Sequence, residues 1–181
     1  MKKLFLLMLM TTFLAMGKSG AQSFSLRTSL TMLATATPNI EMSMPVSKKI
    51  SVHLPVMYNP WIMRENSRFQ QLTVMPGIRW WQQQCGVHYF CSFYAIASRY
   101  HVGGWFDSKY RYDGTGYGGG ASVGYSWVLS DHWNLDFEAG IGVIWTDYDK
   151  CGWQSDSHRY GSYKGLRFIP TKLDISLAYF F

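Results

Sequence analysis

The sequence predicts an all-β fold, namely an eight-stranded antiparallel up-and-down transmembrane β-barrel of the outer-membrane type. Apolar and polar residues alternate with period two along eight segments, as expected for strands with one apolar face. Aromatic residues make up 17% of the chain, and many fall near the ends of these segments, where barrels carry interfacial girdles. The chain also ends on an amphipathic stretch, "KLDISLAYFF", rather than on a polar tail.

The N-terminal stretch "MKKLFLLMLMTTFLAMGKSGAQS" has the layout of a secretory signal peptide, with basic, apolar and small-residue regions in that order. Its apolar run, 4–16, is shorter than the roughly 20 residues that span a bilayer. We therefore expect a signal peptide at 1–21, cut after Ala21, and a barrel domain at 22–181. An uncleaved N-terminal anchor is the alternative. No cysteine follows the cut, so we expect no lipoprotein anchor.

The charge of the chain does not indicate nucleic acid as a partner. The formal net charge is +6, and it falls to +3 when the three lysines of the leader are removed. That excess is too small for the basic surface of a nucleic-acid-binding domain. The length suits one domain.

The eight predicted strands follow one another along the mature chain. Their ranges are 24–34, 39–46, 50–58, 70–81, 88–100, 113–128, 133–146 and 172–181. The predicted apolar face of the first four carries Leu26, Leu30, Met32, Ile40, Met42, Met44, Val46, Ile50, Val52, Leu54, Val56, Tyr58, Leu72, Val74, Ile78 and Trp80.

The last four strands repeat the pattern, with one less regular member. In 88–100 we place Phe90, Tyr94 and Ile96 on the apolar face and Arg99 on the other. In 113–128 glycine occupies most of the positions between the apolar residues, which suits a tightly packed barrel interior. The segments 133–146 and 172–181 alternate strictly.

Connections of two lengths separate the strands. The segments 47–49, 82–87 and 130–132 are short, whereas 59–69, 101–112 and 147–169 are long; 35–38 is short where a long one is expected. Short turns on one rim and long loops on the other are typical of outer-membrane barrels, whose short turns face the periplasm.

The charged residues inside the strands fall on the face opposite the apolar one. They are Arg27, Arg79, Arg99 and Lys172, and Glu41, Asp136, Glu138 and Asp174. Eight strands enclose an interior that side chains can fill, so this balanced set predicts a plugged, charge-paired lumen. In the alternative, a soluble β-sandwich or soluble eight-stranded barrel, the apolar faces would point inward and these charges would face water.

The C-terminal strand is expected to close the barrel against the first, because a free edge is not tolerated in lipid. A terminal aromatic residue, here Phe181, resembles the signal by which the barrel assembly machinery recognises bacterial outer-membrane proteins.

The sequence gives little support for catalysis, and we expect no catalytic residues, cofactor or metal. The motif "SDSH" at 155–158 offers a nucleophile and a base, but only as neighbours within one loop. Cys85 and Cys151 are predicted on opposite rims, and we expect Cys85 and Cys91 to lie too far apart to bridge. We expect at least Cys151 to be free.

The long loops carry basic and aromatic residues that could bind a partner. The candidates are Trp61, Arg64, Arg68, Trp105, Lys109, Arg111, Trp153, Arg159, Lys164 and Arg167. The basic members suit the phosphates of lipopolysaccharide, and the aromatic members suit a protein or glycan. The alternative is that these loops are merely polar and interfacial.

Several motifs together resemble a family of small Gram-negative outer-membrane barrels, domain-of-unknown-function family 3575 (DUF 3575). They are "LATATPNIEM" (33–42), "YNPW" (58–61), "HVGG" (101–104), "RYDGTGYGGGASVGYSW" (111–127) and "TDYDKCG" (146–152). The resemblance implies an eight-stranded outer-membrane barrel, often encoded near fimbrial-type surface proteins, and supplies no catalytic residues. The chain differs from relatives in its long polar final loop, with one cysteine where they often have a pair.

We therefore expect a structural or binding protein of the outer membrane that acts in adhesion, surface-fibre assembly or envelope integrity. The expected partners are outer-membrane lipids including lipopolysaccharide, the barrel assembly machinery, and fimbrial or other surface proteins. The alternatives are an outer-membrane enzyme acting on lipid A or peptides and a narrow transporter for a small solute.

Overall fold

The computed structural model describes residues 24–64, 67–103, 110–152 and 159–181. The predicted signal peptide, 1–21, lies outside these residues. The elements are β1 (Ser25–Ser29), α2 (Leu30–Ala34), β2 (Asn39–Ser47), β3 (Ile50–Asn59), β4 (Ile62–Arg64), β5 (Ser67–Val74), β6 (Gly77–Trp81), β7 (His88–Gly103), β8 (Tyr110–Val128), β9 (Trp133–Gly152) and β10 (Arg159–Phe180). In the described part of the chain, no helix is long and apolar enough to cross a membrane.

The strands form one antiparallel sheet that closes on itself, so the predicted fold class is confirmed. Adjacent strands of the wall pair antiparallel, and β1 pairs with both β2 and β10, which closes the sheet. β5 and β6 occupy one position in the wall, because both pair with β3 and with β7. Proline at 76, which has no N–H to donate, separates them. The wall therefore has eight strand positions, and β4 is a short extension paired with β5.

The first predicted strand is too long, and the reason is local hydrogen bonding. β1 ends at Ser29, where the sequence predicted a strand to residue 34. The Ser29 hydroxyl accepts a hydrogen bond from the Met32 N–H at 3.1 Å and so caps the short helix α2. The side chain of Asn39 binds both backbone groups of Ser29, which removes them from the strand ladder.

Two predicted loops are largely strand. β7 runs to Gly103 and β8 begins at Tyr110, within the predicted loop 101–112. β9 and β10 pair through most of the predicted loop 147–169, from Arg159↔Cys151 onward. These extensions carry polar residues on both faces, so the apolar alternation disappears although the backbone ladder continues.

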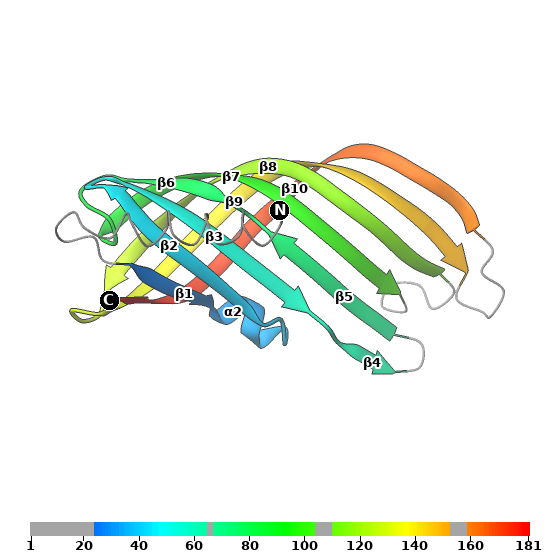
Figure 1. Cartoon of the computed structure of the whole chain (residues 1–181), viewed down its shortest axis with the longest axis horizontal. Helices are drawn as coiled ribbons and strands as arrows, with labels where there is room; N and C mark the ends of the chain where they lie inside the picture. The colour runs from blue at the N-terminus through cyan, green and yellow to red at the C-terminus, as the bar shows by residue number, and fades with distance from the viewer. Residues whose placement is uncertain (1–23, 65–66, 104–109, 153–158) are drawn as a thin grey trace, which may run out of the picture.

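The wall is consequently of unequal height. Figure 1 shows β7–β10 extending well beyond β1, β2 and β3 at the end opposite the short turns. β1 pairs with β10 only from Ser29↔Ser176 to Ser25↔Phe180. Beyond Ser176, towards the tall end, β10 has no second strand partner in the described chain, and α2 packs at this seam.

Candidate functional site in the barrel interior

The two faces of the wall have opposite polarity. Large apolar side chains are exposed on the outside of every strand position except β1, whereas most fully buried side chains are polar or charged. This distribution is the reverse of a soluble protein, in which the closed interior is apolar.

The outer apolar surface forms a belt of defined height. On β8 it runs from Tyr117 to Trp127, and on β9 from Trp133 to Trp145, all four exposed. The ten-residue step from Tyr117 to Trp127, along a strand tilted by roughly 45°, rises about 24 Å. That height matches the apolar band of a barrel in a bilayer, about 25 Å tall with aromatic residues at both edges.

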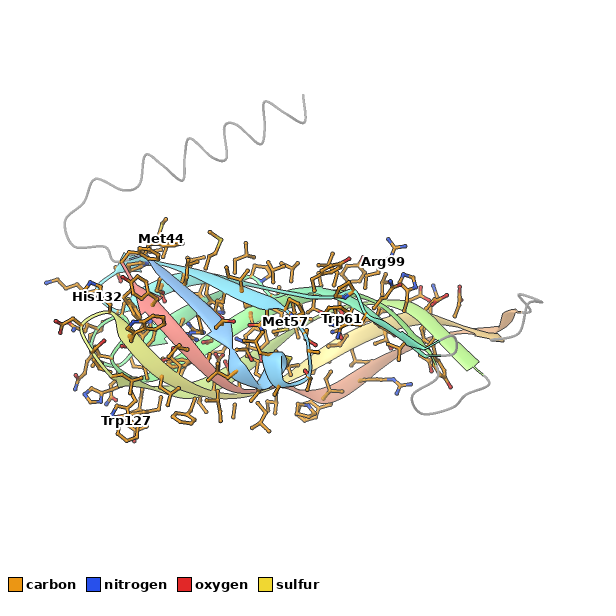
Figure 2. The ribbon with its side chains drawn as sticks, turned by 90° about the horizontal axis from the view of Figure 1, so that it is seen from below. Met44, Met57, Trp61, Arg99, Trp127 and His132 are labelled. Carbon is orange, nitrogen blue, oxygen red and sulfur yellow. The ribbon has the colours of Figure 1, made fainter. Side chains whose placement is uncertain are left out.

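Polar side chains begin directly above the belt on the same outer face. Lys164 lies 2.7 Å from Asp147, and His101 Nδ1 lies 3.0 Å from Asp113. Arg99 belongs to this polar rim, since it lines one groove with these four residues. Figure 2 shows Arg99 towards the tall end, while Trp127 and His132 lie at the short-turn end.

Arg99 therefore does not lie in the lumen, and its predicted placement is wrong. Phe90, Tyr94 and Ile96 are buried on the inner face of β7, so the odd-numbered residues of this strand point outward. The prediction reversed the strand because both of its faces are apolar, with Phe93 and Ala95 on the other side.

The other predicted charges lie on the inner face, and six of them join in one cluster. This lumen charge cluster consists of Arg27, Glu41, Arg79, Asp136, Glu138 and Lys172, all buried. Arg79, fully buried, lies 2.9 Å from Glu41 and 3.1 Å from Glu138. Glu138 also accepts from Lys172 at 2.8 Å and from Ser122 at 2.5 Å.

Arg27 completes the cluster at β1. It pairs with Asp136 on β9 and lies 3.4 Å from Glu41 and 3.5 Å from Glu138. Every member thus has an opposite charge beside it, which offsets the cost of taking it out of water.

Asp174 serves a different purpose from the other carboxylates. It accepts hydrogen bonds from the Ser29 hydroxyl, from Thr31 Oγ1 at 2.6 Å and from Ser176 Oγ at 3.1 Å. Two of these donors lie at the start of α2. Asp174 therefore anchors α2 against β10 at the seam where β1 ends.

Aromatic side chains of the inner face bound the cluster on two sides. The guanidinium of Arg79 lies 4.6 Å from the ring centre of Phe90, whose ring is tilted by 49° against that of Trp81 near the short turns. On the other side, the ammonium of Lys172 lies 4.6 Å from the ring centre of Tyr94. Cation–π contacts of this kind stabilise buried cations.

The side chain of Tyr94 crosses the lumen next to two glycines of the wall, Gly120 and Gly140. A methyl group at Gly120 would lie 2.8 Å from the Tyr94 ring, and one at Gly140 would lie 2.7 Å from its hydroxyl. That hydroxyl forms a 2.5 Å hydrogen bond with Thr171 on β10. The alternate glycines of β8 and β9 therefore make room for the aromatic residues of β7.

Above Tyr94 the lumen changes character and opens into an apolar cavity of about 750 Å³. Its apolar lining comes from Met32 of α2 and from five wall residues or their neighbours, namely Met57, Met75, Ile96, Ile144 and Ile169. Tyr94 packs with Met75 and Ile96 and separates this cavity from the charges below. The interior thus has two layers, one ionic and one apolar.

The surface candidates are scattered. Trp61 is exposed and donates its indole N–H to the Ala36 carbonyl beside α2. Lys164 points outward, whereas Arg167 pairs with the inward Ile144 and hydrogen-bonds Tyr148 at 3.2 Å. The side chains of Arg64, Arg68, Arg111 and Arg159 are not among those described, and Trp105, Lys109 and Trp153 lie outside the described residues.

The predicted assembly signal, Phe181, lies exposed at the end of β10. Its ring lies 4.8 Å from that of Tyr179 and 5.7 Å from that of Phe24, and its N–H bonds the Phe24 carbonyl at 2.9 Å.

The described cysteines and acidic residues make no obvious reactive site. Cys85 and Cys91 are free thiols, and burial raises the pKa of Cys85 in its turn. The side chain of Cys151 is not described. Among the described residues, no group of three or more His, Cys, Asp or Glu side chains could hold a metal ion.

Sequence reasoning missed the apolar cavity and the crossing tyrosine. The available signal was the glycine series on β8: Gly120 and Gly124 pair with Tyr94 and Phe90. A large aromatic residue opposite glycine fits the crowded inner face of a small barrel, and this pairing would have set the orientation of β7.

The comparisons with known proteins place the chain at the level of a family. No curated protein and no solved structure matches it. One family model, described as "Protein of unknown function (DUF3575)", matches residues 4–181, which is nearly the whole chain. The chain therefore belongs to the DUF3575 family.

Proposed function

We propose that the protein is a non-conducting outer-membrane barrel that acts as a structural or binding protein at the cell surface. One observation supports this most strongly: a belt of exposed apolar residues, edged by Tyr117, Trp127, Trp133 and Trp145, surrounds an ionic interior. Soluble monomers rarely expose apolar patches larger than a few hundred Å², and a lipid bilayer would cover this belt.

The tall rim of β7–β10 is the part that this proposal offers to partners. It rises past the belt and carries charges of both signs, including Arg99, Lys164, Asp147 and the His101–Asp113 pair. Its cations could pair with lipopolysaccharide phosphates. A rim of this kind suits adhesion, surface-fibre assembly or envelope integrity.

Cell fractionation tests the location. The proposal expects the protein in the outer-membrane fraction, with a gel mobility that changes on boiling because the folded barrel resists detergent. Recovery of the folded protein as a soluble periplasmic species would contradict it.

Deletion of the gene tests the role. The proposal expects altered surface proteins or fibres, or a more permeable envelope, all restored by the unmodified gene. A change confined to lipid A acylation would instead indicate an enzyme. A second complementing gene carries both Lys164→Gln and Arg99→Gln. This variant keeps the barrel but removes two cations of the rim, and it is compared with the unmodified gene.

A further inference from the structure

The apolar cavity in the tall half of the barrel has the size and lining of a ligand site. Its volume of about 750 Å³ lies within the 300–1,000 Å³ typical of small-molecule pockets. Met57, Met75, Ile96 and Ile144 supply flexible or branched apolar walls. Methionine in particular adapts to chains of varied shape.

The cavity is closed at its lower end. Tyr94 and Thr171 are joined by a 2.5 Å hydrogen bond across the lumen, and Lys172 below them is paired with Glu138. A ligand that enters from above therefore meets no unpaired charge at the floor. This arrangement suits the end of an apolar chain.

A cation lies on the inner face just above the residues that line the cavity. Arg167 lies on the inner face of β10 and pairs with Ile144 of β9. Along β10 it is two residues from Ile169, which lies on the same face and lines the cavity. Its side chain is exposed and bonds Tyr148, and among the described side chains it has no acidic partner within ion-pair distance. Lys164, three residues away on the outer face, is already paired with Asp147.

The wall beside the cavity has a weak point. Above Ser176, β10 lacks a second strand partner in the described chain, and α2 fills the place that β1 would occupy. A crevice of about 20 Å³ lies here between Met32 of α2, the inward Lys172 and the outward Leu173. The seam thus joins the belt to the interior at the level of the cavity floor.

From these features we propose that the cavity binds one acyl chain whose anionic head group lies beside Arg167. The apolar lining selects the chain, the closed floor accommodates its methyl end, and the guanidinium of Arg167 selects a carboxylate or phosphate. The chain comes either from a free fatty acid or from an anionic membrane lipid that inserts one tail past α2. This inference goes beyond the proposed function, because it concerns the interior and not the rim.

Photo-crosslinking tests the proposal directly. The full-length mature protein, folded into phosphatidylethanolamine vesicles, is irradiated with a palmitate analogue that carries a diazirine near its methyl end. The expected labels lie on inner-face residues such as Ile96, Ile144 and Met75. In a second arm, the same photoreactive chain is carried by phosphatidylglycerol in the vesicle. Inner-face labelling in that arm identifies the membrane lipid as the source, and inner-face labelling by palmitate alone identifies the free acid.

Two neighbouring residues provide a matched pair of variants. Ile144→Trp fills the cavity and is expected to abolish inner-face labelling, whereas Val143→Trp, on the outer face of the same strand, is expected to leave it unchanged. Folding is checked by the gel shift on boiling. If Ile144→Trp does not fold, Ile96→Phe on β7 and Met75→Phe between β5 and β6 serve the same purpose.

The head-group claim needs its own comparison. Arg167→Gln is expected to lower labelling by the palmitate probe about fivefold, as for loss of an exposed ion pair worth about 1 kcal/mol, and to leave labelling by its methyl ester unchanged. Lys164→Gln is the control and should change neither. An equal decrease in labelling by the acid and by the ester would show that Arg167 does not bind the head group.

The proposal is overturned if both probes label only the outer belt, or if Ile144→Trp folds and still shows full inner-face labelling. Failure of the protein to enter vesicles would contradict the proposed membrane location instead. The free-acid arm, repeated on protein held in an amphipathic polymer, would then still decide whether the cavity binds a chain.

Discussion

The guanidinium of Arg79 on β6 lies 3.1 Å from the carboxylate of Glu138 on β9, so one ion pair spans the lumen between strands that are not neighbours. The same guanidinium also reaches Glu41 on β2 at 2.9 Å. A single side chain therefore ties three parts of the wall together from inside. The consequence is a lumen closed by ionic contacts rather than by a loop or an apolar core.

Breaking this cluster should destabilise the barrel. Arg79→Met leaves Glu41 and Glu138 buried with fewer cationic partners, and loss of one partner of a buried pair costs about 3–5 kcal/mol. The midpoint of urea unfolding in vesicles, followed by the gel shift on boiling, should fall accordingly. Arg99→Met is the control and should leave the midpoint unchanged, because Arg99 lies on the outer rim. A midpoint for Arg79→Met equal to that of the parent would show that the cluster does not hold the wall together.

Asp174 should control how firmly α2 closes the seam. Asp174→Ala leaves the hydroxyls of Ser29 and Thr31 without their acceptor, and bonds to a charged group are worth about 1.5–3 kcal/mol each. Limited proteolysis should cleave the variant faster between residues 30 and 38. Asp131→Ala is the control, because Asp131 lies in the exposed turn between β8 and β9. This variant should be cleaved between residues 30 and 38 at the parental rate. Equal protection of the two variants would mean that other contacts, such as those of Asn39, suffice to fix α2.

A methyl group at Gly120 should disturb the crossing tyrosine. Gly120→Ala places a carbon 2.7 Å from the Ile141 carbonyl oxygen and 2.8 Å from the Tyr94 ring, and overpacking of this kind costs about 1–3 kcal/mol. Gly165→Ala, where nothing lies within 4 Å, should change the stability by less than about 0.5 kcal/mol. The free energies of unfolding of both variants, measured in the same vesicles, test this. Similar values for the two glycines would contradict the role assigned to Tyr94.

Phe181 should matter more for assembly than for the final structure. It is exposed, and its ring contacts those of Tyr179 and Phe24. Deletion of Phe181 should lower the amount of folded protein in the outer membrane, while refolding into vesicles in vitro remains close to parental. Phe181→Tyr, which keeps the aromatic ring, should assemble normally. Normal assembly after the deletion would show that Phe181 is not part of the assembly signal.

Much of the fold could be predicted from the sequence because the outside of the wall imposes a simple pattern. Along β2, β3 and the lower part of β9 every second residue is apolar, and most of these residues are exposed, for example Val52, Leu54 and Ile141. Period-two alternation identifies such strands and also sets the inward direction of Arg27, Asp136 and Glu138.

The errors occurred where that pattern carries no information. Both faces of β7 are apolar, so the burial of Tyr94 could be inferred only from its pairing with Gly120. In the tall rim, polar residues such as Asp147 and Lys164 occupy the outer face, and the strands looked like loops. At Ser29, capping and the bonds from Asn39 ended a strand whose alternation continues. The two-layered interior depends on contacts between distant strands, which no local pattern encodes.

Single-channel recording in a planar bilayer tests the central claim of a membrane barrel with a closed lumen most directly. Insertion is verified on the same sample by the gel shift on boiling. The cluster around Arg79 and Glu138 and the crossing Tyr94 obstruct the lumen at two levels, so the unmodified protein should insert without conductance steps. Large, stable channels formed by the unmodified, inserted protein would contradict the account.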